Sequence, residues 1–324
     1  MNLLSFLIYL PLQIAFIPLT IVGGIWVAYK QLVVSSRQGL SHTAIEIING
    51  RWTMHIFGLR DDPATAKLAG KLNNTSTFGL WLALFPLWVK YRISGKYFLY
   101  PKPPEQGKEG IVDLVPARTI YIDQMINRIA ETAEQFVAMG AGYDTRSFDM
   151  LSGRGLQCFE LDQQVVQAHK RQYLELAGVA TEDVRFLTVD FSKENSFEKL
   201  IQSGFDPTSK SLFLWEGVTL YLSEEEVRNT LRDFRDQAPV GSVLIADIYA
   251  NRFLAALTRS AGARKSLEAT NEMLNFGLDF EAGAREMLQD FIESESLKLG
   301  ETRFLGRDNE NGPFAAVFEV SASS

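Results

Sequence analysis

The sequence reads QFVAMGAGYDTR over residues 135–146 and FELD over residues 159–162, and these two stretches decide the fold. In the first, an apolar run leads into a glycine turn. In the second, an apolar run ends in carboxylates about twenty residues after the first glycine. This spacing is typical of a doubly wound sheet that binds a cofactor containing adenosine. The glycines let the backbone approach the ligand, and the acidic side chain accepts hydrogen bonds from the ribose hydroxyls.

The glycine pattern is incomplete for a dinucleotide. Gly140 and Gly142 supply the first two glycines, but Thr145 stands where a third glycine would let a helix pack closely and seat a pyrophosphate at its N-terminus. A nucleoside cofactor without a diphosphate, such as S-adenosylmethionine, needs no such anion site. The turn therefore favours methyl transfer over hydride transfer.

The composition is that of a globular protein, with 324 residues of which 46% are hydrophobic and 22% charged. The chain can hold one large domain with appendages or two modest domains. The net charge is −7 and no long run of Lys or Arg is present. We therefore expect no nucleic acid partner.

The histidines and the cysteine predict neither a metal site nor a disulfide. His42, His55 and His169 lack the spacing of metal ligands, so we expect no bound metal. The single Cys158 lies in an apolar strand pattern and has no partner for an internal disulfide. We interpret it as a small buried hydrophobic side chain in a protein of a reducing compartment.

The N-terminal stretch, residues 3–29, contains no charged side chain and is long enough to cross a bilayer, which takes about 20 apolar residues. It lacks the basic start and the small-residue cleavage site of a signal peptide, which favours a retained membrane anchor. Pro11 and Pro18 bend any helix here, and a bent span or a re-entrant hairpin are both open. Lys30 and Arg37 follow, so the positive-inside rule predicts a membrane protein whose remaining chain is cytoplasmic.

A second apolar run covers residues 78–89 and is too short to cross a bilayer. Aromatic and basic residues at its end fit a segment at the level of the lipid headgroups, whereas a core helix of the globular part is the alternative. A loop rich in Pro and Gly follows. We predict three regions: a membrane anchor over 1–34, a helical cap over 35–110 with an interfacial segment at 78–92, and a catalytic domain over 111–324.

Beyond that loop, strand and helix patterns alternate, as a parallel sheet covered by helices requires. We predict strands over residues 135–140, 156–161, 184–189, 211–216 and 242–248, with two more in the tail over 296–305 and 313–321. Helices fit over 163–177, 196–202 and 224–237, the last with Ser223 as N-cap and Glu226 at the capping-box position.

Acidic residues stand at the ends of most of these strands. Ligands of such sheets bind outside the carboxyl ends of the strands, at the switch point of the topology. Four strands that end in carboxylates indicate a ligand with amine, hydroxyl or sulfonium groups. The residues concerned are 140–144, Glu160, Asp162, Asp190, 216–221 and 247–249.

At these positions the sequence resembles the leucine carboxyl methyltransferase family, a branch of the class I S-adenosylmethionine-dependent methyltransferases. The resemblance covers about residues 110–320, and Arg51, His55 and 60–63 match a helical cap of the family less closely. It implies an α/β fold with a doubly wound, seven-stranded Rossmann-like methyltransferase sheet and S-adenosyl-L-methionine as cofactor. The matching segments are ARTIYID at 117–123, MGAGYDTR at 139–146, FELDQ at 159–163, VDF at 189–191 and EGVTLYL at 216–222.

The resemblance also implies which residues bind the cofactor. Arg118 would pair with the methionine carboxylate, a contact that suits its planar guanidinium. Gly140 and Gly142 would admit the backbone close to the cofactor. Asp162 would accept from the ribose hydroxyls, with Glu160 as the alternative.

Further along the chain, Asp190 and Phe191 would hold the adenine by a hydrogen bond and a ring contact, and Glu216 would lie near the amino group or the sulfonium. We interpret Asp144 and Arg146 as an internal ion pair that shapes the loop, in preference to a direct catalytic role.

Methyl transfer is an in-line displacement from a sulfonium, so alignment supplies much of the acceleration. A carboxylate acceptor needs no base, whereas an alcohol or phenol needs a proton acceptor, for which His55, Asp123, Tyr221 and Tyr249 are candidates. We name Tyr221 and His55 as the candidate catalytic residues, with packing as the alternative role of each.

The sequence therefore predicts a membrane-anchored methyltransferase that acts on a carboxylate or hydroxyl oxygen of a lipophilic small molecule. The anchor makes a soluble protein a poor acceptor. Two alternatives stay open: an NAD(P)-dependent oxidoreductase, and a membrane-associated protein that keeps a cofactor fold without catalysis. The acceptor itself has no readable motif, since its pocket is built from the cap and from residues 249–280.

Overall fold

A mixed seven-stranded sheet forms the centre of the computed structural model, which describes residues 3–191, 194–259, 273–280 and 283–322. The strand order is β3-β2-β1-β4-β5-β7-β6, and β7 runs antiparallel between β5 and β6. All seven predicted strands are confirmed, with ends that differ by a residue or two. They are β1 (Gln135–Met139), β2 (Gln157–Asp162), β3 (Val184–Thr188), β4 (Ser211–Trp215), β5 (Val243–Tyr249), β6 (Leu297–Leu305) and β7 (Ala315–Ala322).

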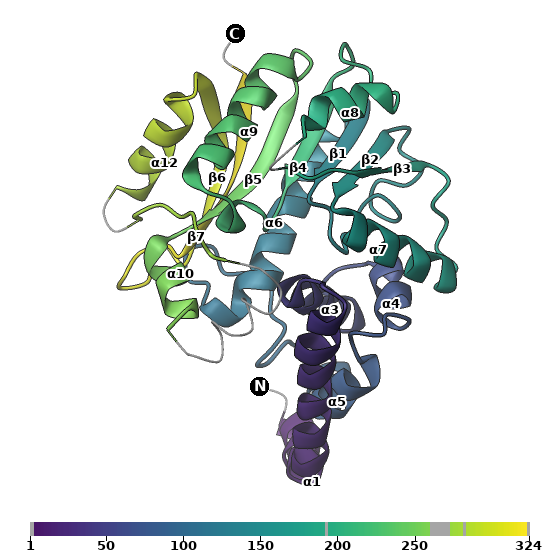
Figure 1. The fold of residues 1–324 in the computed structure, drawn as a ribbon. Coiled ribbons are helices and arrows are strands. Elements are labelled where there is room, and N and C mark those ends of the chain that lie inside the picture. The colour runs from purple at the N-terminus through teal and green to yellow at the C-terminus, as the bar shows by residue number, and fades with distance from the viewer. Residues whose placement is uncertain (1–2, 192–193, 260–272, 281–282, 323–324) are drawn as a thin grey trace.

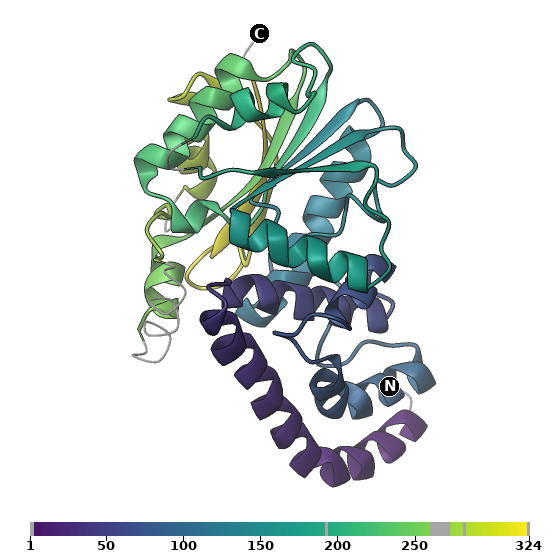
Figure 2. The same cartoon turned by 45° about the vertical axis from the view of Figure 1, so that its right-hand side comes forward.

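Helices cover both faces of this sheet (Figure 2). The helix α9 begins at the predicted capping box, in which Ser223 Oγ accepts from the Glu226 amide at 3.3 Å and Glu226 Oε2 accepts from the Ser223 amide at 2.7 Å. The helical elements of this region are η2 (Ile111–Asp113), α6 (Leu114–Ile129), α7 (Gln164–Leu176), α8 (Ser196–Gln202), η3 (Thr219–Tyr221), α9 (Glu224–Gln237), α10 (Asn251–Leu257) and α12 (Ala284–Glu293).

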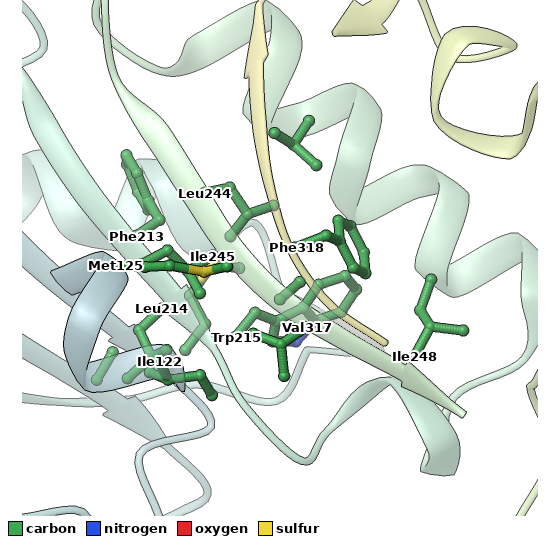
Figure 3. Close-up of a cluster of buried hydrophobic side chains, with 14 of the residues drawn as sticks. Ile122, Met125, Phe213, Leu214, Trp215, Leu244, Ile245, Ile248, Val317 and Phe318 are labelled. Atoms are coloured by element: carbon green, nitrogen blue, oxygen red, sulfur yellow. The ribbon is translucent and has the colours of Figure 1, made fainter. Parts of the chain in front are cut away.

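The core lies on both sides of β4 and β5, as Figure 3 shows. On one side, Phe213 contacts the rings of Phe197 in α8 and Phe234 in α9, with centroids 5.5 and 5.4 Å apart. On the other side, Leu214 faces Ile122 of α6 (Figure 3). Because both faces are buried, β4 is apolar along nearly its whole length instead of alternating, which is why its run was readable as a strand.

The region predicted as a helical cap contains the helices α2 (Ser35–Arg37), α3 (His42–Ile56), α4 (Pro63–Ala69) and α5 (Thr77–Ser94). The second apolar run forms α5, which is packed between two other helices. Its Trp81 meets Trp52 of α3 at 5.7 Å, and its Phe85 stacks on Phe16 of α1 (Leu3–Ala28) at 5.3 Å between ring centroids.

The first apolar run forms α1, which continues into the π-helical turn η1 (Tyr29–Val34). Pro11 and Pro18 lie inside α1 without ending it, and the helix bows around α5 (Figures 1 and 2). Gly23 and Gly79 allow close packing, since a Cβ on Gly23 would lie 2.6 Å from the Gly79 carbonyl oxygen. Within the described chain, Leu3–Arg37 is the one helical segment long and apolar enough to cross a membrane, judged by length and composition alone.

Candidate active site

A cavity of about 1380 Å³ lies at the carboxyl ends of the parallel strands, between the sheet and the cap. Its walls come from β1, β2, β4 and β5 on one side and from α1, α3 and α5 on the other. All the predicted cofactor-binding residues and one of the two predicted catalytic residues line it. They are Arg118, Gly140, Gly142, Asp162, Asp190, Phe191, Glu216 and Tyr221.

The glycine turn has the backbone that only glycine adopts readily. Gly140 and Gly142 have φ angles of +70° and +46°, and a Cβ on Gly140 would lie 2.5 Å from Val218 Cγ2. No helix begins between β1 and β2, a stretch that the structure describes throughout. The turn therefore lacks the helix N-terminus on which a dinucleotide pyrophosphate would sit.

Asp162 ends β2 beside this turn, and its carboxylate accepts from the amides of Gly142 at 2.6 Å and Gln163 at 2.7 Å. Burial raises the pKa of Asp162 above its usual value, although these two amides oppose the shift. The bonds fix the carboxylate at the cavity wall, where further donors can approach it.

Glu160, the alternative to Asp162, points elsewhere. Its side chain is buried on the strand, outside the cavity wall, and accepts from Lys170 Nζ at 2.6 Å. Two residues apart on one strand, Glu160 and Asp162 share a face, but only Asp162 lies at the strand end. The ribose role proposed from the resemblance therefore stays with Asp162.

Glu216, directly after β4, is held by three arginines. It accepts from Arg51 Nη2 at 2.9 Å and Arg146 Nη1 at 2.6 Å, and Arg118 Nε lies 3.1 Å from its other oxygen. Burial alone would raise the pKa of Glu216, but the three guanidinium groups outweigh it and lower the pKa to about 2. Glu216 is therefore a fixed negative charge at the cavity wall.

Arg118 projects from α6 and is 4% exposed. It donates to Asp247 at 3.0 Å and to the Tyr249 hydroxyl, and it forms the ion pair with Glu216. Burial would lower the pKa of Arg118, but Tyr249, Glu216 and Asp247 raise it above its usual value. The guanidinium stays charged and lies in the cavity wall, already flanked by carboxyl groups.

The predicted ion pair between Asp144 and Arg146 is confirmed. Arg146 is fully buried and also donates to Asp123 at 2.6 Å, while Arg51 donates to Asp144 at 2.9 Å. Arg60 extends this network to Asp123 and Asp62. The whole network joins the cap to the sheet through Arg51, Arg60, Arg118, Arg146, Asp62, Asp123, Asp144, Glu216 and Asp247.

The four candidate proton acceptors separate into two groups. Tyr221 and Tyr249 line the cavity, and the Tyr221 hydroxyl shares a hydrogen bond of 2.6 Å with Thr43 Oγ1. Burial raises the pKa of Tyr249 well above its usual value, so it stays protonated. His55 and Asp123 lie outside the cavity wall.

His55 Nδ1 accepts from the Asp62 amide at 3.0 Å, so the imidazole holds the turn between α3 and α4. Asp123 accepts from Arg60 and Arg146, each at 2.6 Å. Neither side chain lines the cavity, so the positions of His55 and Asp123 do not support a catalytic role.

Two contributors to this site, Thr43 and Arg51, had little or no signal in the sequence. Thr43 is a single hydroxyl in a helix, and nothing in the pattern connects it to Tyr221. Arg51 stood out only in the weaker part of the resemblance. Asp247 and Tyr249 had a readable signal, because residues two apart on a strand share a face, and both contact Arg118.

The buried cysteine is confirmed, and burial raises the pKa of the Cys158 thiol to about 12. Among the described residues, no group of three or more His, Cys, Asp or Glu side chains is placed to hold a metal ion.

Comparison with known proteins identifies relatives of this chain. A protein of Mycobacteroides abscessus is 30% identical over 177 residues, covering 53% of this chain and 58% of that protein. YktD of Bacillus subtilis is 32% identical over 141 residues, covering 43% and 46%. Both carry the provisional name S-adenosyl-L-methionine-dependent methyltransferase. The matches thus span about half the length of these relatives.

Solved structures with a similar arrangement include the mitomycin 7-O-methyltransferase MmcR, with 15% identity, a TM-score of 0.43 and coverage of 92% of this chain and 68% of that one. Human N-acetylserotonin methyltransferase in complex with SAM has 9% identity, a TM-score of 0.42 and coverage of 65% and 53%. The family assignment rests on sequence instead. Residues 59–235, more than half of the chain, match the leucine carboxyl methyltransferase family, and the chain belongs to that family.

Proposed function

We propose that this protein is an S-adenosylmethionine-dependent methyltransferase that methylates an oxygen of a lipophilic small molecule at a membrane, with its catalytic domain in the cytoplasm. One observation carries the proposal: a single cavity joins the polar strand ends, where the cofactor would bind, to apolar side chains of α1 and α5. Family membership and the names of the relatives support the reaction class.

The residues at the strand ends fit S-adenosylmethionine. Gly140 and Gly142 leave space for a close backbone approach, and Asp162 is fixed to accept from ribose hydroxyls. Asp190 and Phe191 would contact the adenine from the next strand end. When bound, the cofactor supplies an electrophilic methyl group on a sulfonium.

The arginine network suits the charges of this cofactor. Its five carboxyl groups against four guanidinium groups leave the network with no excess positive charge that would repel a sulfonium. Glu216 and Asp144 are the two carboxylates of the network that line the cavity, and the pKa of each is lowered, so both are ionised. Arg118, beside Glu216, would face the methionine carboxylate.

The acceptor side of the cavity is apolar. Val27 of α1 and Leu80, Ala83 and Leu84 of α5 line it, together with side chains of the loop before α6. Such a wall binds a lipophilic acceptor by burial of apolar surface. Tyr221, held by Thr43, offers a hydroxyl that would orient an acceptor oxygen.

A carboxylate is the acceptor that the geometry favours over a hydroxyl. A carboxylate attacks without losing a proton, whereas a hydroxyl needs a base, and neither His55 nor Asp123 lines the cavity. Of those candidates only two tyrosines line the cavity, and a tyrosine near neutral pH is a weak proton acceptor.

The alternatives have less support. An oxidoreductase would need a binding site for the dinucleotide pyrophosphate. Such a site lies at a helix N-terminus, and no helix begins between the glycine turn and β2. A protein without catalysis would not need the cavity to connect the strand ends with an apolar wall.

Two measurements on the full-length protein in detergent test the proposal. Calorimetric titration should show binding of S-adenosylmethionine and none of NAD or NADP. Transfer of a radiolabelled methyl group into a lipid extract of the source cell should yield a product from which base releases labelled methanol, as a methyl ester does.

Dinucleotide binding without S-adenosylmethionine binding would overturn the methyltransferase assignment. A labelled product that is stable to base would leave the methyltransferase assignment intact and would show that the acceptor is a hydroxyl and not a carboxylate. Binding of S-adenosylmethionine with no labelled lipid would reject the lipophilic acceptor.

A further inference from the structure

Both ends of α1 are held against the rest of the protein. At the N-terminal end, Phe6 lies 5.1 Å from the ring of Phe98, and Lys90 Nζ lies 4.8 Å from the Phe6 ring. At the C-terminal end, Lys30 Nζ donates to the Asn73 carbonyl at 2.8 Å. Figures 1 and 2 agree that the chain runs away from the sheet and then turns back toward it.

The middle of the bow points away from the protein and is apolar. Ile14, between the two prolines, is 61% exposed, and Leu10 and Ile17 are 57% and 48% exposed. No residue from 3 to 29 carries a charge. An exposed surface of this kind is unstable in water, and the partner that covers it is apolar.

The charge distribution identifies that partner as a lipid layer. Residues 1–104 contain ten Lys or Arg against three Asp or Glu, a net charge of +7. Residues 105–324 contain 22 against 36, a net charge of −14. The basic charge is thus concentrated in the part that carries the apolar bow, as attraction to an anionic membrane surface requires.

The shape of α1 determines how deeply the helix enters the lipid bilayer. A straight helix of 26 residues would be about 39 Å long and would cross a bilayer. The bowed helix returns to the side from which it started, and Lys30 and Lys90 mark its two ends. A crossing would carry one of these ends through the hydrocarbon.

The two prolines of α1 give a second reason to place the helix near the membrane surface. Pro11 cannot donate to the Leu7 carbonyl, nor Pro18 to the Ile14 carbonyl, because proline has no amide hydrogen. Such carbonyls find no partner at the centre of a bilayer, whereas water reaches them near the headgroups. A shallow position satisfies them.

We propose that α1 enters a single leaflet, with the stretch between Pro11 and Pro18 deepest and both helix ends on the side of the sheet. The protein is then monotopic, and the N-terminal end of α1 stays on the cytoplasmic face with the catalytic domain. This inference rests on the membrane location in the proposed function, but its test needs no methyl transfer.

The test adds full-length protein to preformed vesicles of phosphatidylcholine and phosphatidylglycerol. Cysteines are introduced singly, as Leu3→Cys, Ile14→Cys and Val240→Cys, whose native side chains are 69%, 61% and 98% exposed. The natural Cys158 is buried and its raised pKa keeps it unreactive, so the unsubstituted protein serves as the labelling blank.

We expect a maleimide that cannot cross membranes to label Leu3→Cys as completely as Val240→Cys without detergent. An environment-sensitive dye on Ile14→Cys should be quenched by lipids brominated on their acyl chains, and the same dye on Val240→Cys should not. Bromines near the headgroup end of the chains should quench it better than bromines near the bilayer centre.

Labelling of Leu3→Cys only after detergent is added would overturn the single-leaflet arrangement and establish a crossing helix. Failure of all variants to bind vesicles would overturn membrane association itself. Neither result would touch S-adenosylmethionine binding, so the two proposals fail separately.

Discussion

The end of the sheet and the bow of α1 are built on opposite principles. At the sheet end, charged side chains are buried and each has partners: Arg146 is fully buried and bonds Asp144, Glu216 and Asp123. In α1, apolar side chains such as Ile14 are exposed and lie outside the hydrophobic core. Each arrangement is the reverse of what an ordinary soluble core shows.

The difference shows how the two regions contribute to function. Burying a charged side chain costs free energy unless its partners are in place, so the network fixes the position of the charged groups at the cavity wall. Exposed apolar surface is unfavourable only until a lipid or an acceptor covers it. The ion-pair network therefore holds the polar side chains of the cavity in place, whereas the bow of α1 offers apolar surface to a nonpolar partner.

The largest effect should come from breaking the network. Arg146→Ala leaves three carboxylates without their shared cation, and we expect a loss of about 5 kcal/mol in the free energy of unfolding, measured by urea titration. Arg307→Ala is the matched control, because the exposed Arg307 pairs with neighbouring Asp308 at the surface and its loss should change stability by less than about 1 kcal/mol. Similar losses in both variants would contradict the role given to the network.

The buried ion pair between Glu160 and Lys170 lies outside the cavity, so it tests how charge alone affects the stability of the fold. Burial raises the pKa of Glu160 from 4.5 to about 7, against the opposing effect of Lys170. The folded protein therefore holds this proton more tightly than the unfolded chain, and the contribution of Glu160 to stability falls as the pH rises from 4.5 to 7.

Lys170→Met should steepen this dependence. At pH 8 the ionised Glu160 loses its partner, and we expect a loss of about 3 kcal/mol. Because Lys170 lowers the pKa of Glu160, its removal raises that pKa further, and the loss shrinks as the pH falls toward 7 and the carboxyl is protonated. The double variant Glu160→Gln/Lys170→Met should give a flat profile over the same range. A pH-independent loss in Lys170→Met would show that packing, not charge, sets the effect.

At the cofactor side, Asp162→Asn keeps the shape of the side chain but removes its charge. Charge-assisted hydrogen bonds to the ribose would weaken, and we expect calorimetry to show S-adenosylmethionine affinity reduced about 10- to 100-fold, or about 1.4–2.8 kcal/mol. Asp183→Asn, at an exposed position, should leave the affinity unchanged. Unchanged affinity in Asp162→Asn would show the ribose assignment to be wrong.

The smallest effect on folding should come from the bow. Ile14→Ala should change the free energy of unfolding in water by less than about 0.5 kcal/mol, because the side chain is exposed. Ile245→Ala makes the same chemical change in the core and should cost about 2–5 kcal/mol. Vesicle binding should reverse the ranking, with only Ile14→Ala weakened in a sedimentation assay.

Much of the fold was readable because its signals are local. Strands buried on both faces are continuous apolar runs, and β4 and β5 were predicted to within a residue or two. The start of α9 followed from Ser223 and Glu226, which act three residues apart. The apolar runs do not specify the order of the strands in the sheet, because strand pairing depends on contacts between residues distant in the sequence.

The site residues that could be predicted from the sequence are those at the ends of strands. Asp162 ends β2, while Asp190 and Glu216 lie within two residues of the ends of β3 and β4, and the topology alone brings such positions to one edge. His55 was given a candidate role from residue type, and its actual partner is a backbone amide in a turn. The bond between Thr43 and Tyr221 joins residues 178 positions apart, which no local pattern indicates.

By itself, the sequence determined the strand pattern, the glycine turn and the charge-free N-terminal stretch, since each depends on neighbouring residues and on their polarity. Only the tertiary structure decided which charges meet, that Arg51 and Arg118 share Glu216, and that α1 bows around α5 instead of extending. The physical reason is that ion pairing and helix packing act between side chains that the chain brings together only when it is folded.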